Sequence, residues 1–462
     1  MARITQLSVV VLTIFVLFSG CRFTAEKFDE QIVKSKIDEA WNEDYTLILK
    51  KIITPSFNKD TIKISRTESF VKELNSKISL LSEKGGGVVK ILKGTYLVNG
   101  PVLLKSNVNL NLSKDCKLVF SGIPKDFLPV VKTRWEGTFL MNYSPLIYAE
   151  GETNIAITGQ GEIDGNALHT WARWKTMQKS DKMALRQMGN DKITLPEREF
   201  GQGYHLRPSA IQFINCENIL LEGFRIYNAP FWTIHPVLSK NITIRDLEIG
   251  AGSSNDDGID PESCSNVLIE HCSIDTNDDC IAIKAGRDQD GWGHAPSENI
   301  IVRNNTLKSN VGSGFCIGSE MSAGVRNIFV ESNTIQGSKK HAFQFKSNPD
   351  RGGYIRNIYM RNIEVCKPVK YGFEFTTDYK GWRGNQFFVA YSDFYFQNIS
   401  LVETTDLSIK IMGRKEKKIR KVYFENIKIK KANTPITLKY LEDYNFKNTY
   451  LNGSSIDNDF NF

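Results

Sequence analysis

Two groups of aspartates have the residue type and spacing that acid–base chemistry requires. The groups are Asp256, Asp257 and Asp260, then Asp275, Asp278 and Asp279. Relative to Asp257 as position i, Asp278 is i+21 and Asp279 is i+22. If one turn of the fold has about that length, the two groups lie side by side on neighbouring turns.

Carboxylates that face one another suit three kinds of role. In glycoside hydrolysis, repulsion raises the pKa of one carboxyl group, which protonates the leaving oxygen while the others activate water. Clustered aspartates also bind Ca²⁺. Turns rich in Asp and Asn frequently do no more than cap backbone groups. The spacing alone leaves catalysis, calcium binding and structural turns open.

The remainder of the chain repeats at a similar interval. Asn followed by Ile or Val and then by alternating residues recurs at Asn154, Asn218, Asn241, Asn266, Asn299, Asn327 and Asn357. From Asn218 onward these starts recur roughly every 23 to 33 residues, and a second short strand-like segment follows each start. Repeats of this kind predict an all-β, right-handed parallel β-helix. The Leu-x-x-Leu-x-Leu pattern of leucine-rich repeats is missing, and propeller blades need longer repeats.

Three segments make up the predicted domain organisation. Residues 1–20 form a signal peptide, residues 21–65 an N-terminal arm with a helix near 28–41, and residues 66–455 a single β-helix domain. A helical apolar pattern at residues 68–84 predicts a helix that caps the open end of the stack. The longest insertions, residues 167–206 and 286–297, are expected to wall a cleft.

The N-terminal segment up to Cys21 carries an export pattern. Arg3 precedes the apolar run 7–18, and Ser-Gly-Cys then ends at Cys21. This arrangement resembles a bacterial lipobox, which predicts lipidation of Cys21; a plain signal peptide and a membrane anchor are the alternatives. Because no acidic run follows Cys21, we expect a lipid-anchored protein that faces the periplasm.

Charge and cysteine content limit the possible partners. The net charge of +7 is small and scattered for a chain of 462 residues, which argues against nucleic acid and favours a polyanionic substrate. Beyond Cys21 there are seven cysteines, an odd number, with no zinc-like spacing. We therefore expect buried cysteines, no metal, no cofactor and a monomer.

The order Asn255-x-Asp257-Gly-x-Asp260 followed by Asp278-Asp279 resembles the signature of the polygalacturonase-like glycoside hydrolases, family 28. Further matching motifs are GEIDG at 161–165, NAPFWTIHPV at 228–237 and FKSNPDRGGYIRNI at 345–358. The combination is similar to the bacterial, often exo-acting branch. The resemblance implies an inverting hydrolase that cleaves galacturonic-acid-containing bonds in pectic polysaccharides.

The resemblance also implies roles for individual residues. Asp278 would be the general acid, whereas Asp257 and Asp279 would hold and activate the attacking water. Asn255 would brace the first group, and Lys346 would contact a substrate carboxylate. His235, which is i−22 relative to Asp257 and hence about one coil away, is a further candidate substrate-binding residue.

Two departures from the family pattern bear on the substrate. Ser313 stands where the family usually has a histidine between two glycines, and Gln344 stands where it usually has an arginine. Gln cannot make the charge-assisted pair that Arg makes with a carboxylate, a loss of roughly 1.5–3 kcal/mol. We therefore expect rhamnogalacturonan or a decorated pectin rather than plain homogalacturonan. His341, which is near Gln344 in sequence, could substitute, although a structural role is the alternative.

Other interpretations remain open at this stage. A β-helical polysaccharide lyase would need a calcium site beside a strong base, and a non-catalytic carbohydrate-binding β-helix would need no intact acid. Five residues in or near the insertions could wall the cleft or pack in the core: Arg134, Trp135, Trp171, Trp174 and Trp292.

Overall fold

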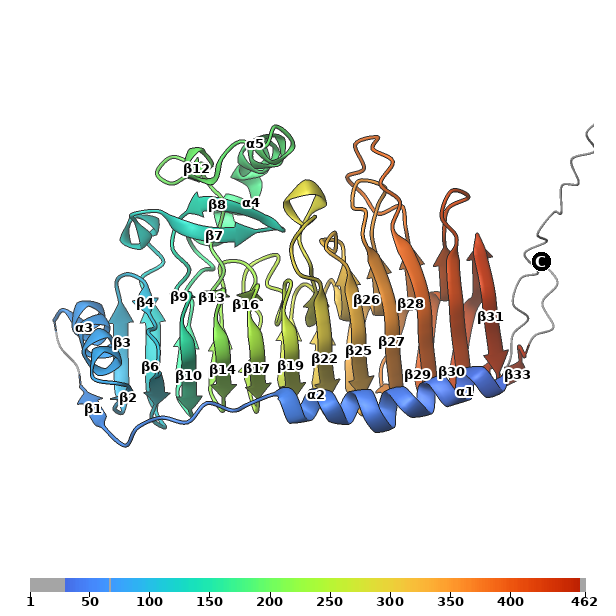
Figure 1. The fold of residues 1–462 in the computed structure, drawn as a ribbon, viewed down its shortest axis with the longest axis horizontal. Helices are drawn as coiled ribbons and strands as arrows, with labels where there is room; N and C mark the ends of the chain where they lie inside the picture. Colours follow the sequence, from blue (N-terminus) through green and yellow to red (C-terminus); the bar gives the residue numbers. More distant parts are fainter. Residues whose placement is uncertain (1–29, 66–67, 458–462) are drawn as a thin grey trace, which may run out of the picture.

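The computed structural model describes residues 30–65 and 68–457 and confirms the parallel β-helix. Successive coils stack along the long axis of the molecule (Figure 1). The described strands of the coils form three parallel stacks, in which each strand pairs with its counterpart one coil away. The predicted signal segment and Cys21 lie outside the described residues.

The first stack carries the Asn repeat that was visible in the sequence. Its strands are β1 Thr61–Ile64, β2 Gly87–Ile91, β5 Val108–Leu112, β10 Thr153–Gly159, β14 Glu217–Glu222, β17 Lys240–Arg245, β19 Ser265–Glu270, β22 Ser297–Arg303, β25 Val325–Glu331, β27 Tyr354–Val365, β29 Ala390–Met412, β30 Ile419–Lys439 and β31 Leu441–Lys447. The repeat asparagines adopt positive φ, 55–58° from Asn154 to Asn357, a conformation that Asn tolerates better than most residues. Their side-chain amides bond one another in a continuous ladder from Asn107 to Asn357, with N···O distances of 2.9–3.3 Å.

The second stack follows the first along each coil, and its strand β20 ends two residues before Asp278. Its strands are β3 Gly94–Val98, β6 Cys116–Phe120, β11 Glu162–Asp164, β15 Arg225–Tyr227, β18 Glu248–Ile249, β20 Ser273–Thr276, β23 Thr306–Ser309 and β32 Tyr450–Leu451, together with parts of β26, β27, β29 and β30. The short β33 Ser454–Ser455 pairs antiparallel with β32.

The third stack carries the predicted site residues. Its strands are β4 Val102–Leu103, β9 Ile147–Glu150, β13 Ile211–Ile214, β16 Ile234–Val237, β21 Ile281–Ile283, β24 Ser313–Gly318, β26 Thr334–Lys346 and β28 Val369–Thr376, and it ends on β29 and β30. Between β16 and β21, single bridges at Ile259 and Glu262 continue the stack.

Apolar side chains fill the interior between the stacks. Alternate residues of each strand point inward, so similar side chains meet one coil apart. Phe343 stacks on Phe373 with ring centroids 4.9 Å apart, and Phe345 lies 4.5 Å from Phe375. Six of the seven cysteines described are buried and all seven are free, so no disulfide links the coils in this part of the chain.

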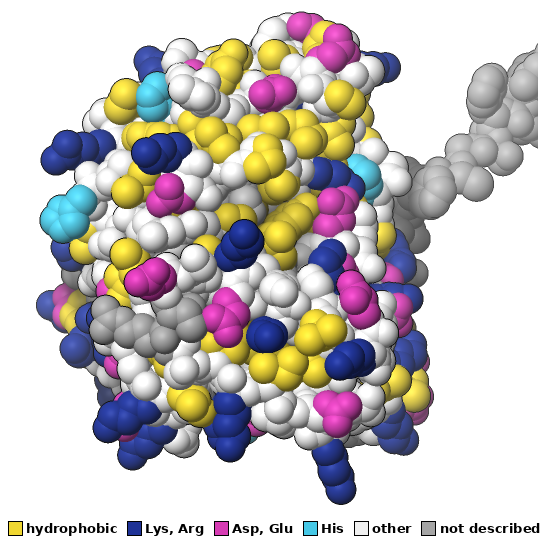
Figure 2. Space-filling model, turned by 90° about the vertical axis from the view of Figure 1, so that its left-hand side faces the viewer, with side chains coloured by type: hydrophobic (Ala, Val, Ile, Leu, Met, Phe, Trp, Pro, Cys, Tyr) yellow, Lys and Arg dark blue, Asp and Glu magenta, His cyan; other side chains and the backbone are white. Residues whose placement is uncertain are grey.

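The predicted capping helix is present as α3, Phe70–Glu83. It buries Phe70, Leu74, Ile78 and Leu81 against the first coil and covers its apolar cross-section. Seen from this end, Lys and Arg side chains are interspersed with Asp and Glu among uncharged ones (Figure 2). The cap therefore presents a polar surface that prevents further strand stacking.

The N-terminal arm is more ordered than its sequence indicates. The helix expected near 28–41 extends through α1 Glu30–Glu39, a π-helical turn Ala40–Asp44 and α2 Tyr45–Lys51, and it lies along the outside of the first stack (Figure 1). Its apolar side chains pack on a ladder of aromatic rings from Phe329, Tyr359 and Tyr395. Tertiary packing, which local sequence does not reveal, sets the length of this helix.

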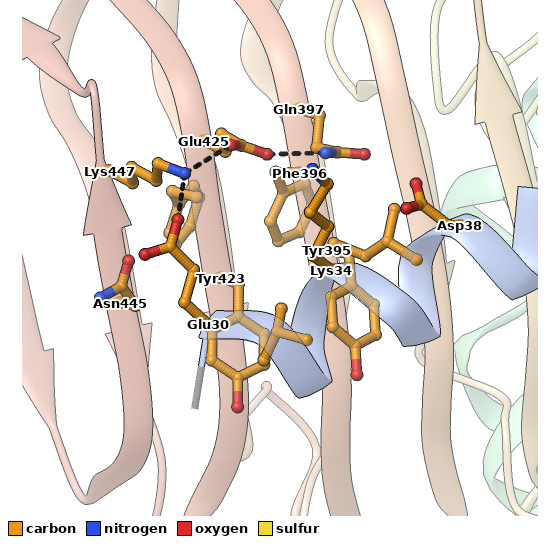
Figure 3. Close-up of a pocket in the computed structure, with 13 residues that line it drawn as sticks. Glu30, Lys34, Asp38, Tyr395, Phe396, Gln397, Tyr423, Glu425, Asn445 and Lys447 are labelled. Atoms are coloured by element: carbon orange, nitrogen blue, oxygen red, sulfur yellow. Dashed lines mark hydrogen bonds and ion pairs between the residues drawn. The ribbon is translucent and has the colours of Figure 1, made fainter. Parts of the chain in front are cut away.

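The start of α1 is held by charges on the last coils. Glu30 pairs with Lys447, which also lies 3.3 Å from Glu425, around a hollow between the helix and the strands (Figure 3).

The predicted boundary at residue 66 is wrong by one strand, because β1, within the predicted arm, pairs in parallel with β2. No helix among residues 30–65 and 68–457 is both long and apolar enough to cross a membrane.

The insertions rise on the side of the molecule opposite to α1 and α2 (Figure 1). The elements there are the 3-10 turns Pro124–Phe127, Trp171–Arg173, Leu195–Glu197 and Asp288–Asp290, the hairpin β7 Val131–Trp135 and β8 Thr138–Asn142, then α4 Trp174–Met177, α5 Lys179–Asn190 and β12 Glu199–Phe200. They flank the third stack, where the cleft was expected.

Trp41 should be central to the docking of the arm. It is buried against Phe329, and Arg361 lies 3.6 Å above its ring. We expect Trp41→Ala to weaken docking by about 3–5 kcal/mol, as for other buried aromatic truncations. Amide hydrogen exchange over residues 30–51 should accelerate while the coil strands stay protected. Leu47→Ala, at a side chain 51% exposed, is the control, and equal effects of the two substitutions would contradict this assignment.

Candidate active site

The two aspartate groups lie on neighbouring coils, as their spacing predicts. The backbone N–H of Gly258 donates to the carbonyl oxygen of Asp279 at 2.9 Å, and Ile259 forms a parallel bridge with Ile281. One coil therefore separates Asp257 from the Asp278–Asp279 pair, at the usual inter-strand distance of about 4.8 Å.

Asp256 holds the turn that carries the aspartate pair. Its buried carboxylate accepts hydrogen bonds from the backbone N–H groups of Gly252, Asn277 and Asp278, at 2.6, 3.1 and 3.0 Å. The Asn277 side-chain amide donates to the same carboxylate at 3.1 Å. These bonds bend the backbone before Asp278, so that two consecutive aspartates serve one site although adjacent strand residues point to opposite faces.

The next coil approaches this turn too closely for any side chain. A Cβ atom on Gly312 would lie 2.4 Å from the carbonyl carbon of Asp278 and 2.5 Å from the backbone nitrogen of Asp279. Only glycine fits at such a close approach of two backbones. The close contact places the following residue, Ser313, beside Asp279.

Asp278 is half-buried at the wall of a cavity of about 380 Å³. Burial and the neighbouring Asp279 raise the pKa of its carboxyl group. The amide of Asn255 lies within reach of it, with Nδ2 3.3 Å from Oδ2 of Asp278. A carboxyl group that stays protonated at pH values closer to neutral can act as a proton donor.

Asp279 has the opposite electrostatic environment. Lys346 Nζ lies 2.7 Å from its Oδ2, the Ser313 N–H donates to its Oδ1 at 2.8 Å, and the Cys316 thiol lies 3.1 Å away. Burial alone would raise the pKa of Asp279, but Lys346 and Lys284 outweigh it and hold that pKa well below its usual range. Asp279 is therefore ionised wherever the protein is folded near neutral pH.

Asp257 forms a buried group with Asp260 around one lysine. Lys284 Nζ lies 3.2 Å from Asp257 and 3.5 Å from Asp260, and it stacks over the ring of Trp232. Burial raises the pKa of both carboxyl groups, that of Asp260 to about 8; the charge of Asp260 adds to the rise at Asp257, and the charge of Asp279 to the rise at Asp260. The pair thus holds a proton at neutral pH. Lys284 opposes the rise in the pKa of both carboxyl groups.

His235 does not contact the cleft. It is fully buried, with Nε2 2.9 Å from Glu262 and Nδ1 2.8 Å from the amide nitrogen of Gln212. Glu262 also pairs with Arg134 at 2.6 Å, and burial lowers the pKa of His235. The prediction that His235 binds substrate is therefore wrong, because its place one coil away from Asp257 lies beneath the surface of the third stack.

Comparison with known proteins places this geometry in a family. Residues 133–449 match the family described as "Glycosyl hydrolases family 28". The chain belongs to this family. The glycoside hydrolase class and the β-helix that the motifs predict are thereby confirmed.

Relatives within family 28 cover most of the chain. An exopolygalacturonase from Thermotoga maritima superposes with a TM-score of 0.85 at 34% identity, over 89% of this chain and 96% of that one. An endo-polygalacturonase from Pectobacterium carotovorum is 28% identical over 76% of this chain and 82% of its own length. A probable polygalacturonase from Vitis vinifera is 28% identical over 71% of this chain, which spans 64% of the Vitis protein.

The positions at which this chain departs from the family pattern lie at the C-terminal side of the aspartates. Ser313 lines the cavity, but it has no exposed surface. Its hydroxyl is therefore not available to a substrate, which contradicts the substrate-binding role predicted for this residue. His341, one coil away in register, covers it, with Nδ1 3.4 Å from the Ser313 hydroxyl. Gln344 lines the same cavity and donates to Glu374 at 2.7 Å. His341 Nε2 also contacts Glu374, at 2.8 Å.

The insertion approaches the acid from the N-terminal side. Lys175 of α4 bonds the side-chain oxygen of Asn255, and the buried Arg207 donates to the same atom at 3.0 Å. Asn255 is thus oriented by two cations, with its amide nitrogen turned to Asp278. Asn255 was expected to brace the first aspartate group, but these hydrogen bonds join it to Lys175, to Arg207 and to Asp278 of the second group.

The aromatic candidates divide between core and surface. Trp135 stacks on Phe231 in a buried cluster, and Trp171 is fully buried, so neither walls the cleft. Trp174 packs edge-on against Tyr143, and Trp292 is 36% exposed beside Phe387.

Sequence reasoning missed three charged residues of the site. Lys284 was visible as a single charge at the end of the apolar segment Ile281–Ile283, which is an unusual place for an unpaired lysine. Glu374 and Lys175 gave no such signal, because outward charges on strands and charges in insertions are ordinary. Among the described residues, no group of His, Cys, Asp and Glu side chains is arranged to hold a metal ion.

The pH dependence of hydrolysis should change when the ion pair between Lys346 and Asp279 is removed. Removing a cation next to a carboxylate raises the pKa of that carboxylate, so Lys346→Met should shift the acidic limb of kcat/KM upward by roughly one to three pH units. Lys370→Met is the control, since Lys370 lines the same cavity but pairs with Asp406 at 3.7 Å. An acidic limb that stays in place in Lys346→Met would rule out this role of the pair.

Proposed function

We propose that the protein is an inverting hydrolase of galacturonic-acid-containing glycosidic bonds in pectic polysaccharides. One observation carries the proposal: Asp278 and Asp279 are adjacent, yet their surroundings drive their pKa values in opposite directions. Two carboxyl groups whose environments separate their pKa values are the arrangement that assigns one acid and one base.

The reaction follows from this division. Asp278 donates its proton to the glycosidic oxygen as the bond from that oxygen to the anomeric carbon breaks. Asp279 and Asp257 hold a water molecule, and one of them takes a proton from it as the water oxygen bonds the anomeric carbon from the opposite side. Lys284, 3.2 Å from Asp257, opposes the rise in the pKa of Asp257 and favours the ionised form that this task needs.

Charge around the cavity supports an acidic polymer as the substrate. Lys340, Lys370 and Lys380 line the cavity that contains Asp278 and Asp279. Such a concentration of cations raises the local concentration of a polyanion. The family 28 relatives described above are named polygalacturonases or exo- and endo-polygalacturonases, which act on polymers of this charge.

The position of the insertion supports attack at chain ends. Lys175 contacts Asn255, which in turn contacts Asp278, so α4 stands two contacts from the acid. Room for substrate on the N-terminal side of the acid is thereby restricted. We propose exo action, in which a short saccharide is released from one end of the polymer.

We also propose, from the sequence, that the protein is exported and lipid-anchored at Cys21, that it faces the periplasm, and that it acts as a monomer. The Ser-Gly-Cys motif after an apolar run supports the anchor. Metabolic labelling with a fatty-acid analogue, with Cys21→Ser as the comparison, tests this point. Label retained in Cys21→Ser would refute it.

Asp278→Asn should lower kcat on pectic polymers by roughly 10²–10⁴-fold, since the amide cannot donate the catalytic proton. Release of reducing ends measures turnover, and ultraviolet absorbance of the products detects the unsaturated sugars of a lyase. Asp275→Asn is a matched control, because Asp275 belongs to the same cluster but pairs with Lys308 at 2.6 Å on the second stack. Ultraviolet-absorbing products, or full activity in Asp278→Asn, would refute the proposal.

Early product size tests the exo assignment. Chromatography during the first few per cent of reaction should show one short saccharide, and the viscosity of the polymer should fall slowly. A ladder of long oligomers with rapid loss of viscosity would show internal cleavage instead.

A further inference from the structure

A cluster of polar side chains lies beside the catalytic aspartates, one coil toward the C-terminus. Cys316, whose thiol contacts Asp279, is in register with Gln344, which is in register with Glu374 and then with Lys410. Gln344 and Glu374 line the cavity that contains Asp278. A sugar bound next to the scissile bond on this side would lie over them.

The hydrogen bonds within this cluster engage the side-chain nitrogens of His341 and Gln344. The amide nitrogen of Gln344 and Nε2 of His341 both lie within hydrogen-bond distance of Oε2 of Glu374, at 2.7 and 2.8 Å. Lys410 Nζ occupies the other carboxylate oxygen at 2.8 Å. Behind them, the Ser313 hydroxyl lies 3.4 Å from both His341 Nδ1 and the Gln344 carbonyl oxygen. Of His341, Gln344 and Glu374, the groups that remain for a ligand are acceptors, namely the Gln344 carbonyl and the lone pairs of Glu374, although Lys340, Lys370 and Lys380 line the same cavity.

Glu374 is ionised at neutral pH. Burial alone would raise its pKa, but contacts with His341, Lys410 and Gln344 lower it to about 2. A galacturonate carboxylate is itself an acceptor without a proton, so it cannot donate a hydrogen bond to the Gln344 carbonyl or to Glu374. A sugar hydroxyl, in contrast, donates a hydrogen bond to an ionised acceptor, which is among the stronger kinds.

We propose that the floor formed by His341, Gln344 and Glu374 binds an uncharged sugar through its hydroxyl groups in preference to galacturonate. Glu374 is then the residue that determines specificity. The preferred substrate is a pectic heteropolymer in which a neutral sugar adjoins the cleaved bond, while Lys340, Lys370 and Lys380, which line the same cavity, contact its acidic sugars. This inference rests on the proposed hydrolysis of pectic polymers.

Binding tests the inference without turnover. In an Asp278→Asn background, calorimetry gives Kd for two probes of equal length: oligogalacturonate, and an oligomer that alternates galacturonic acid with rhamnose. The alternating probe should bind more tightly. Adding Glu374→Gln should reduce that preference at least about tenfold, the loss expected for one hydrogen bond to a charged acceptor. The ratio of kcat/KM values on the two polymers should fall in parallel in the active enzyme.

Matched variants separate specificity from general damage. Glu403→Gln is the control, because Glu403 pairs with Lys431 across neighbouring coils at 2.7 Å but lies outside the residues that line the cavity. Gln344→Arg alone should gain little affinity for oligogalacturonate, since Glu374 would bind the new guanidinium. Gln344→Arg with Glu374→Gln frees that guanidinium and should reverse the preference.

Two results would overturn the inference: tighter binding of oligogalacturonate by the Asp278→Asn protein, or the same preference after Glu374→Gln as after Glu403→Gln. An intact binding preference in a protein that cleaves no pectic polymer would instead refute the proposed hydrolysis and leave the sugar selectivity standing.

Discussion

The asparagine ladder sets the register on which the site depends. Each ladder residue takes a left-handed backbone conformation at a corner of its coil, and its amide bonds the equivalent amide one coil away. A slip of one residue would flip every inward side chain to the outside, so the ladder and the apolar core enforce the same alignment. With that alignment in place, Asp257 and Asp279 are neighbours in space although a full coil of sequence separates them.

Placing several carboxylates together has an electrostatic cost that two buried lysines offset. Lys284 lies among Asp257, Asp260 and Glu320, and Lys346 lies on Asp279. Asp278 has no direct ion pair among these contacts. Its carboxyl group therefore keeps its proton to a higher pH than that of Asp279, and it lies at the wall of the cavity. The distribution of two cations among the carboxylates thus creates the difference between acid and base.

Specificity and chemistry reside on different coils. In the proposed mechanism the coils of Asp257 and Asp278 carry the reaction, whereas the polar floor comes from β26 and β28, one and two coils beyond Ser313. The insertion acts from the other side through Lys175 and Arg207. Because each coil contacts mainly its neighbours, substitutions such as Gln344 can alter substrate selection without disturbing the aspartates.

Much of this protein can be derived from the sequence. The Asn-Ile repeat predicts a parallel β-helix, and the interval from Asp257 to Asp279 predicts adjacency, because in-register coils convert sequence period into distance. The family motifs assign the reaction class. The length of the helix from Glu30, the burial of His235 and the contacts of Glu374 were decided only by tertiary structure. All three features depend on packing between segments that are distant in sequence. A local sequence pattern therefore cannot predict where a helix docks, how deeply a side chain is buried, or which atoms of other coils it contacts.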